Sequence, residues 1–251
     1  MTITLLQQDI VWGNPSANQA AAEQAILAAA PSDLYVLPEM WSTGFATQPE
    51  GIAESDESSL RWMQQMARRM DAAVAGSVAT QADGRYYNRF YFVKPTGEVV
   101  YYDKRHLFTY GGEHQRYTAG SQRVVVEWRG VRFLLQVCYD LRFPTFARNA
   151  ASGPDAYDVA LYVASWPTSR REPWDLLLRA RAIENQCYVC GVDRVGNDPA
   201  CEYNGGTALI DAYGHTVASC PDGQRTHLTA TLDLERLRAF RQKFPVLADR
   251  D

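Results

Sequence analysis

The segment from Val131 to Pro144, V-R-F-L-L-Q-V-C-Y-D-L-R-F-P, joins an apolar strand to a reactive side chain. The strand-forming run ends at Cys138, and a charged turn leads on to Phe143-Pro144, which is typical of a helix start. A thiol at the mouth of a buried strand is held rigidly and can still meet a ligand, as a nucleophile in an α/β protein must. The pattern equally suits a buried structural cysteine, because free cysteines often act as small hydrophobic residues.

Strands outnumber helices along the chain, and hairpin signals occur beside strand–helix–strand units. The patterns predict helices at 16–30, 55–71, 172–186 and 234–243. They predict strands at 2–8, 34–37, 73–78, 86–94, 98–103, 123–128, 131–138, 158–164, 187–193, 207–211, 215–219 and 227–232. This is the pattern of a mixed-sheet α/β or α+β protein rather than a doubly wound sheet. We see no linker, repeat or low-complexity segment, so we expect one domain over residues 1–251.

Charge and composition exclude several classes of partner. The chain of 251 residues carries a net charge of −4, so nothing favours nucleic acid or an anionic membrane surface. No apolar run approaches the roughly 20 residues that span a bilayer. The segment from Met1 to Asp9 lacks the basic region and apolar core of a signal peptide, so we expect a cytosolic protein. A Gly-rich phosphate loop is also lacking, which argues against a nucleotide enzyme.

The five cysteines suggest thiols rather than disulfides, because their number is odd and the expected compartment is reducing. Cys187 and Cys190 form a C-x-x-C, but no second such pair exists, and the four histidines lack ligand spacing. Tyr188 and Val189 between the two cysteines suggest a strand. We therefore expect no metal and no cofactor, and a redox role of this pair stays open.

Three predicted strands lead to reactive side chains: Leu37 to Glu39, Asp103 to Lys104 and Val137 to Cys138. If these strands lie side by side, a carboxylate, an ammonium and a thiol meet at one rim. A nearby cation favours the thiolate, a carboxylate in a closed pocket becomes a stronger base, and an ammonium can hold an oxyanion. The plain alternative is an exposed ion pair between Glu39 and Lys104 at the strand ends.

Several segments resemble signature segments of the nitrilase, or carbon–nitrogen hydrolase, superfamily. They are L-P-E-M-W (37–41), D-K-R-H-L-F (103–108), V-C-Y-D-L-R-F-P (137–144), R-A-R-A-I-E-N-Q-C-Y-V (179–189) and F-R-Q-K-F-P (240–245). The resemblance extends over nearly the whole chain. Within the superfamily the chain most resembles ω-amidases, which remove ammonia from the terminal amide of 2-oxo dicarboxylic acid monoamides. The fold that this implies is a four-layer α-β-β-α sandwich with two mixed sheets.

The resemblance also implies roles for individual residues. Cys138 would be the nucleophile, and Glu39 the general base that takes the thiol proton and later activates water. Lys104 would hold the oxyanion, assisted by the backbone N–H of Tyr139. Glu113 matches the family's second glutamate and would orient Lys104 or the leaving ammonia. Neither a metal nor a cofactor is needed for this chemistry.

The substrate pocket is less defined by the sequence. Arg142 could bind a substrate carboxylate, but a pair with Asp140 or a neighbouring glutamate is an equally good interpretation. Family members commonly form homodimers or larger homo-oligomers through helical faces, here the helix expected at Phe143 and that near Glu172. The residues that we expect to shape the pocket are Trp41, Phe45, Tyr110, Arg142 and Trp166.

Two alternatives to an ω-amidase remain. The same chemistry could serve a nitrile, an N-carbamoyl amino acid or a simple aliphatic amide. The chain could also be a catalytically silent binding protein on the same fold. In each catalytic case the partner is a small-molecule substrate.

Overall fold

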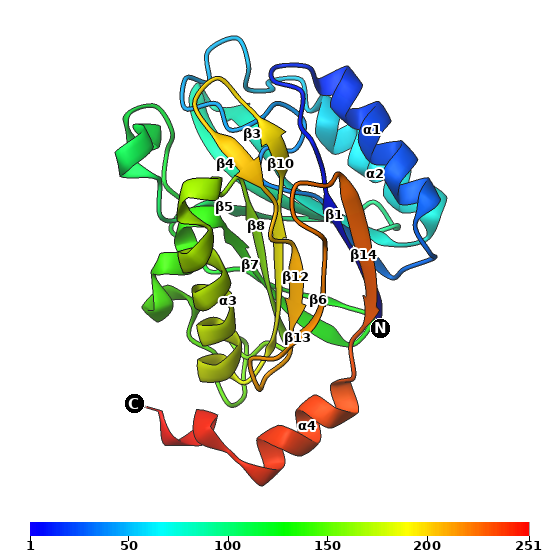
Figure 1. The fold of residues 1–251 in the computed structure, drawn as a ribbon, viewed down its shortest axis with the longest axis vertical. Helices are drawn as coiled ribbons and strands as arrows, with labels where there is room; N and C mark the ends of the chain where they lie inside the picture. Colours follow the sequence, from blue (N-terminus) through cyan, green and yellow to red (C-terminus); the bar gives the residue numbers. More distant parts are fainter. Residues whose placement is uncertain (251) are drawn as a thin grey trace.

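The computed structural model describes residues 1–250, and it consists of two six-stranded sheets packed face to face (Figure 1). The first sheet has the spatial order β14-β1-β2-β3-β4-β5. Its strands are β1 (Thr2–Gln7), β2 (Leu34–Val36), β3 (Ala73–Ala82), β4 (Arg85–Val93), β5 (Val99–Asp103) and β14 (Thr226–Thr231). The strands β1, β2 and β3 run parallel, and antiparallel strands flank them on both sides.

The second sheet repeats this plan in the order β13-β12-β9-β8-β7-β6. Its strands are β6 (Val125–Trp128), β7 (Val131–Val137), β8 (Val159–Ala164), β9 (Tyr188–Asp193), β12 (Ala208–Ile210) and β13 (Thr216–Ser219). Here β7, β8 and β9 run parallel between antiparallel neighbours. A separate hairpin is made by β10 (Val195–Asn197) and β11 (Glu202–Asn204). Parallel strands place their carboxyl ends at one rim, where the chain is free to present functional side chains.

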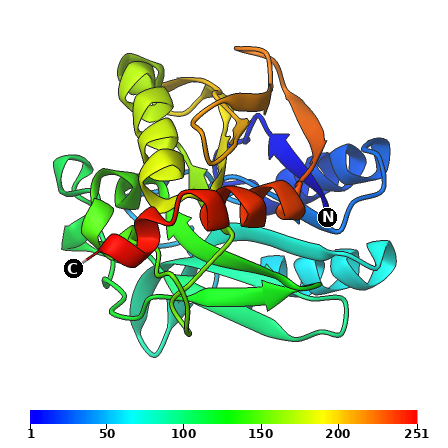
Figure 2. The same ribbon diagram turned by 90° about the horizontal axis from the view of Figure 1, so that it is seen from below.

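Helices cover the two outer faces and complete four layers (Figures 1 and 2). The helices are α1 (Pro15–Ala28), α2 (Ser58–Met70), α3 (Arg171–Asn185) and α4 (Leu234–Lys243). Residues of α1 and α2 pack on the first sheet, and residues of α3 pack on the second. The helix α4 follows β14 and lies near the C-terminus (Figure 2). In the described part of the chain, no helix is long and apolar enough to cross a membrane.

Alternation along the strands explains the layers. In β7, Phe133 and Leu135 face the core between the sheets, whereas Leu134 faces the layer that contains α3. In β1, Leu5 and Leu6 divide in the same way between the central core and the layer of α1 and α2. Each such fully buried side chain contributes roughly 1.5–3 kcal/mol of hydrophobic stabilisation. The four-layer sandwich with two mixed sheets is therefore confirmed.

The twelve strands and the four helices predicted with residue ranges are present within a few residues of their expected bounds. The helix expected at Phe143 is wrong: two 3₁₀-helices, Cys138–Arg142 and Pro144–Ala147, take its place. The chain leaves helical geometry after Ala147 because Asn149 forms two hydrogen bonds to the backbone of Tyr157. The β10–β11 hairpin was missed, since strands of three residues are too short to show alternation.

Candidate active site

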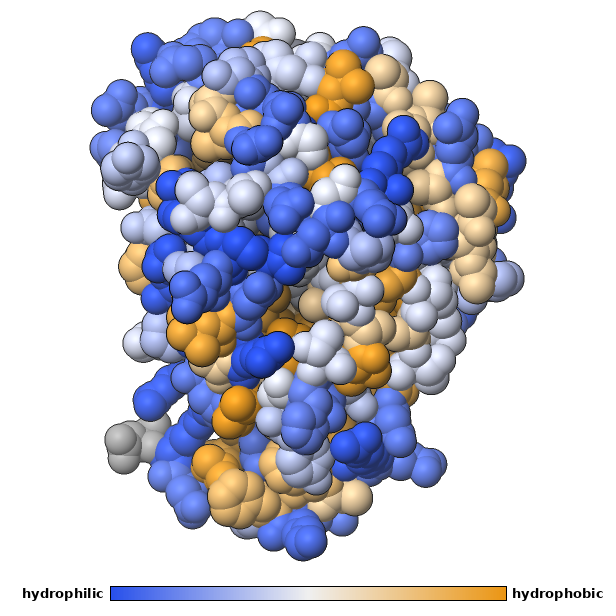
Figure 3. Space-filling view, viewed as in Figure 1, coloured by the Kyte–Doolittle hydropathy of each residue, from blue (hydrophilic) through white to orange (hydrophobic). Residues whose placement is uncertain are grey.

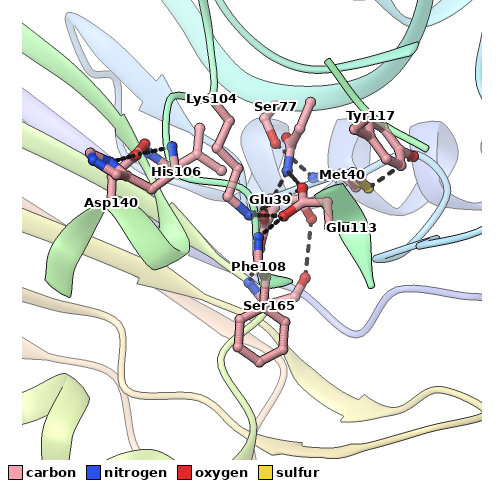
Figure 4. A network of polar contacts seen from close by, with 12 residues as sticks. Glu39, Met40, Ser77, Lys104, His106, Phe108, Glu113, Tyr117, Asp140 and Ser165 are labelled. Carbon is pink, nitrogen blue, oxygen red and sulfur yellow. Dashed lines mark hydrogen bonds and ion pairs between the residues drawn. The ribbon is translucent and has the colours of Figure 1, made fainter. Parts of the chain in front are cut away.

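A buried cluster of charged side chains lies at the rim of the first sheet (Figure 4). The Nζ of Lys104 is 2.9 Å from Oε1 of Glu39 and 2.9 Å from Oε2 of Glu113. All three side chains are fully buried, so an exposed ion pair at the strand ends is the wrong interpretation. Buried charges are stable only when they are paired and hydrogen-bonded, and each of these carboxylates contacts the ammonium.

The strands that carry this cluster are not neighbours, so the condition that the three strands lie side by side is not met. Glu39 follows β2 and Lys104 follows β5, with β3 and β4 between them. Asn88 of β4 fills this gap, and its Nδ2 donates to Glu39 at 2.7 Å and to Glu113 at 3.1 Å. The candidate nucleophile Cys138 follows β7 of the facing sheet. The site is therefore assembled between the two sheets.

Backbone N–H groups complete the hydrogen bonding of the carboxylates. Ser165, directly after β8, donates its N–H to Oε2 of Glu39 at 2.8 Å. Phe108 donates its N–H to Oε2 of Glu113 at 2.6 Å. These bonds fix both carboxylates without leaving a donor of the cluster unpaired, which gives the site its rigidity.

Cys138 occupies a strained backbone position at the exit of β7. Its φ of 45° lies in the left-handed region, where a residue with a Cβ is strained by about 1–3 kcal/mol. It is the first residue of the 3₁₀-helix Cys138–Arg142, and its half-buried side chain lines a cavity. The next residue, Tyr139, lies in the first turn of this helix, where backbone N–H groups have no acceptor within the helix.

The electrostatics of the site favour a neutral thiol beside a charged ammonium. Burial disfavours the charge on Lys104, but the charges of Glu113 and Glu39 outweigh it and raise the pKa of this lysine. Burial, with the charge of Glu39, raises the pKa of Cys138 well above its usual range, although Lys104 acts in the opposite direction. The sequence-based expectation that a nearby cation favours the thiolate therefore does not prevail. Burial also raises the pKa of Glu113.

A cavity lies in front of Cys138, and it is a concave space of the kind in which small molecules bind. Its wall contains two arginines, Arg142 and Arg170, and no acidic residue. The other lining residues are Phe45, Phe108, Cys138, Tyr139, Ser165, Trp166, Pro167, Cys201 and Tyr203. The cavity is thus an aromatic and cationic space that suits a small anionic ligand.

Comparison with known proteins identifies the family to which this chain belongs. A family model described as carbon–nitrogen hydrolase matches residues 2–242. The chain belongs to the carbon–nitrogen hydrolase family. It is accordingly a hydrolase of carbon–nitrogen bonds other than peptide bonds, and its relatives support an amidase of the cysteine type.

The curated relatives of this family member cover its whole length. It is similar to omega-amidase YafV of Yersinia enterocolitica, with 45% identity over 100% of this chain and 97% of that protein. The 2-oxoglutaramate amidase of Bacillus subtilis is 36% identical over 99% of this chain and 96% of that protein. Among solved structures, the CN-hydrolase superfamily protein XC1258 of Xanthomonas campestris has a TM-score of 0.95 and 40% identity. That comparison covers 100% of this chain and 97% of XC1258, whose structure is described with an arsenic adduct in the active site.

Of the residues expected to shape the substrate pocket, Phe45, Arg142 and Trp166 line the cavity of this hydrolase. Two others, Trp41 and Tyr110, are not among the lining residues, and we correct their placement. Trp41 is 2% exposed and packs against Trp62, with ring centroids 4.8 Å apart. Trp41 is close to Glu39 in sequence, but its side chain points into the hydrophobic core and not toward the cavity. Tyr110 lies in the 3₁₀-helix Thr109–Gly111 and is 87% exposed. Its ring is 5.8 Å from that of Phe108, which lines the cavity, but Tyr110 itself is not a lining residue.

The guanidinium of Arg142 is open to a ligand. It lies 5.1 Å from the ring centroid of Trp166 and has no carboxylate partner within residues 1–250. The pair with Asp140 is not formed, because the Asp140 carboxylate accepts hydrogen bonds from other donors. Arg170 likewise lacks a carboxylate partner in the described residues, and its guanidinium lies 5.3 Å from the ring centroid of Phe108.

Sequence reasoning missed four contributors to the site: Asn88, Ser165, Arg170 and Asp193. Asn88 interrupts an otherwise aromatic strand, and that signal could have found it, because asparagine is disfavoured in strand interiors. Asp193 ends β9 fully buried, and burial raises its pKa well above the usual range. Its Oδ1 accepts from the N–H of Trp166 at 2.8 Å, while its Oδ2 has no hydrogen-bond partner among the described residues.

The remaining cysteines form no second centre in the part of the chain that the structure describes. All five are free, and Cys187 and Cys190 are completely buried. No group of three or more His, Cys, Asp or Glu side chains within residues 1–250 is arranged to hold a metal ion.

Proposed function

We propose that the protein is a cysteine-dependent ω-amidase. It hydrolyses the terminal amide of short 2-oxo dicarboxylic acid monoamides, such as 2-oxoglutaramate and 2-oxosuccinamate, to the acid and ammonia. The observation that carries this proposal is the cavity in front of Cys138, whose charged lining residues are the arginines Arg142 and Arg170. The names of the omega-amidase and 2-oxoglutaramate amidase relatives support the same substrate class.

The first half of the reaction forms a thioester. The Cys138 thiol transfers its proton to Glu39 as the sulfur attacks the amide carbonyl carbon. The carbonyl oxygen takes up the electron pair, and the Nζ of Lys104 and the N–H of Tyr139 stabilise this oxyanion. When the tetrahedral intermediate collapses, the carbon–nitrogen bond breaks and the proton held by Glu39 passes to the leaving nitrogen, which departs as ammonia.

The second half releases the acid. A water molecule attacks the thioester carbonyl while Glu39 accepts one of its protons, and the same donors stabilise the new oxyanion. The carbon–sulfur bond then breaks, and the thiolate of Cys138 recovers the proton from Glu39. Glu113 holds Lys104 in place at 2.9 Å throughout, so that the ammonium meets the oxyanion without rearrangement.

Recognition of the far end of the substrate falls to the two arginines. The fork of Arg142 binds the carboxylate of the 2-oxo acid, in the bidentate mode that suits a guanidinium. Arg170 adds a second positive charge, which repels the ammonium of the amino acid amides glutamine and asparagine. Both guanidinium groups lie over aromatic rings of the cavity wall, at 5.1 Å from Trp166 and 5.3 Å from Phe108, which limits their freedom.

The test measures ammonia release from 2-oxoglutaramate, butyramide, glutamine, asparagine and a short nitrile at equal concentration. A site whose polar groups pair with a substrate carboxylate rejects analogues without it, by factors that reach roughly 10⁴–10⁵ where those groups are buried. We expect 2-oxoglutaramate to be preferred, chiefly in kcat/KM, and Arg142→Met to reduce that preference. If butyramide or the nitrile is hydrolysed equally well, the protein is a general aliphatic amidase or nitrilase instead. An N-carbamoyl amino acid in the same panel tests the carbamoyl hydrolase alternative.

A second measurement separates an enzyme from a silent binding protein. Rapid acid quenching during turnover, followed by intact mass spectrometry, should detect an acyl group bound to Cys138 as a thioester. The variant Cys138→Ser should show no thioester. A protein that binds the amide without acylation or ammonia release would be a binding protein on this fold.

Assembly and location belong to the same proposal. We propose a homodimer or larger homo-oligomer that pairs the exposed side of α3, where Leu176 is 66% and Ile183 is 54% exposed. Apolar side chains lie among hydrophilic ones on the face that includes α3 (Figure 3). Light scattering of the protein and of Leu176→Glu tests this pairing. The free state of all five cysteines suits a reducing cytosol.

A further inference from the structure

We propose that Asp140 is a positioning residue that holds the nucleophile and the oxyanion cation in one fixed arrangement. The inference rests on the proposed roles of Cys138 and Lys104, since Asp140 acts through these two residues. Asp140 is fully buried, and both of its carboxylate oxygens accept hydrogen bonds from protein donors, so we assign it no contact with the substrate.

The Asp140 carboxylate accepts four hydrogen bonds from two separate segments. Its Oδ2 accepts from the N–H of Val137 at 2.9 Å and from the hydroxyl of Tyr102 at 2.8 Å. Its Oδ1 accepts from the N–H of His106 at 2.9 Å, and Nδ1 of the same ring lies 2.8 Å away (Figure 4). Only a carboxylate fits this set, because an ionised carboxylate accepts at both oxygens, whereas the NH₂ of an asparagine accepts nothing.

On the nucleophile side, these bonds brace the strained turn. Cys138 has its φ of 45° directly after Val137, whose N–H is fixed by the Asp140 side chain. The backbone carbonyl of Asp140 accepts from the N–H of Phe143 at 3.0 Å, which closes the other end of the turn. A strained residue persists only when its surroundings over-determine it, and Asp140 supplies that constraint on both sides of Cys138.

On the cation side, the bonds hold the backbone around Lys104. Tyr102 and His106 lie two residues before and two residues after it, and both are tied to the same carboxylate. The hydroxyl of Tyr102 also accepts from the N–H of Arg105 at 2.9 Å. Asp140 thus spans the segment that presents the ammonium, and it sets the separation between Lys104 and the nucleophile turn.

A stacked pair of rings strengthens the link between the two segments. The rings of His106 and Phe143 lie parallel within 9°, with their centroids 3.9 Å apart. The turn after the nucleophile and the segment after the cation are therefore joined by both hydrogen bonds and packing. Misplacement of reacting groups by about 1 Å costs roughly 100-fold in rate, so the loss of this link should reduce catalysis strongly.

The test compares Asp140→Asn with the matched control Asp158→Asn. Asp158 also accepts a backbone N–H, from Arg132 at 3.2 Å, and it pairs with Arg241 at 3.0 Å. It precedes β8, at the strand end away from Ser165, so its loss should affect stability and not the site. With the best amide of the panel, we expect kcat of Asp140→Asn to fall roughly 100-fold and KM to change less than about threefold. Asp158→Asn should keep kcat within about threefold of the wild type.

Alkylation of Cys138 by iodoacetamide gives a readout that does not require an amide substrate. We expect the alkylation rate to change in Asp140→Asn and to stay at the wild-type value in Asp158→Asn. Tyr102→Phe removes one of the four bonds and serves if Asp140→Asn does not fold; its kcat should fall about tenfold. The proposal is overturned if folded Asp140→Asn keeps the wild-type kcat and alkylation rate, or, where that variant does not fold, if Tyr102→Phe keeps both. It is also overturned if the kcat of Asp158→Asn falls as much as that of Asp140→Asn. If the wild type hydrolyses no amide, the proposed function fails, and alkylation still tests the link.

Discussion

Replacement of Lys104 by methionine tests the centre of the proposed mechanism. Methionine keeps most of the side-chain volume and removes the charge and the three donors of the ammonium. Loss of one oxyanion donor typically costs about 2.7–4 kcal/mol, or roughly 100- to 1000-fold in rate. We expect Lys104→Met to lose at least this factor in kcat/KM, because the ammonium also opposes the negative charge that develops on Cys138.

The same change should destabilise the fold by an amount that depends on pH. Removal of one partner from a buried ion pair costs about 3–5 kcal/mol, and Lys104 pairs with both Glu39 and Glu113. The pKa of Glu113 is already raised by burial, and it rises further when the charge that lowers it is lost. When the pKa of a carboxyl is higher in the folded than in the unfolded state, the folded state binds the proton more tightly. Lowering the pH therefore restores stability to the folded state. The deficit relative to the wild type should shrink from about pH 8 to about pH 5.

The assay combines urea unfolding at both pH values with ammonia release. The matched control is Lys94→Met, whose partner Glu98 is 2.8 Å away at the surface. Because the Glu98 side chain is 55% exposed, this pair should contribute less than about 1 kcal/mol to stability, and nothing to activity. The reasoning is refuted if Lys104→Met keeps a tenth of wild-type kcat/KM, or if its stability deficit does not change with pH.

Three further predictions concern other side chains. Cys138→Ala should abolish turnover while the unfolding midpoint stays close to the wild-type value; appreciable residual turnover would show that another group is the nucleophile. Glu39→Gln should block both acylation and thioester hydrolysis, and accumulation of a covalent adduct would limit its role to the second step. Burial raises the pKa of Cys187 to about 12, so its thiol should lower the unfolding free energy by about 1.4 kcal/mol per pH unit above about pH 8.5. Cys187→Ala should reduce the slope by that amount, and the other buried thiols, Cys190 and Cys220, whose pKa values burial also raises, should contribute the rest. The variant Val189→Ala, which creates a cavity, should lower stability and leave the slope unchanged.

The strand ends of the site could be predicted because apolar runs end where the sheet ends. Leu37, Asp103 and Val137 mark those ends in the sequence to within one residue, and Glu39, Lys104 and Cys138 beyond them lie close together in space. The order of the strands within each sheet could not be predicted in this way, and neither could the way in which the two sheets face each other. The two sheets place Cys138 opposite Glu39 and Lys104, which no local pattern encodes.

The partners of the cluster were harder to predict because their contacts join distant parts of the chain. Ser165 donates its backbone N–H to Glu39 across 126 residues, and any residue type except proline provides that donor. Asn88 contributes a side chain, so its polar character in an apolar strand carries a signal. Trp41 shows the opposite case: proximity in sequence to Glu39 suggested a pocket role, but packing against Trp62 decides its position.

The charges around Cys138 indicate when its proton leaves. Glu39, Glu113 and Asp193 are all fully buried, and Lys104 is the ammonium between the first two. If every group were ionised, a thiolate would add another negative charge to a region where acidic groups already exceed the ammonium. Burial and Glu39 raise the pKa of Cys138 for this reason, and burial raises that of Asp193. A resting thiolate is therefore disfavoured. In the proposed mechanism the proton is best transferred to Glu39 as the sulfur attacks, because negative charge then moves at once from sulfur to the oxyanion beside Lys104.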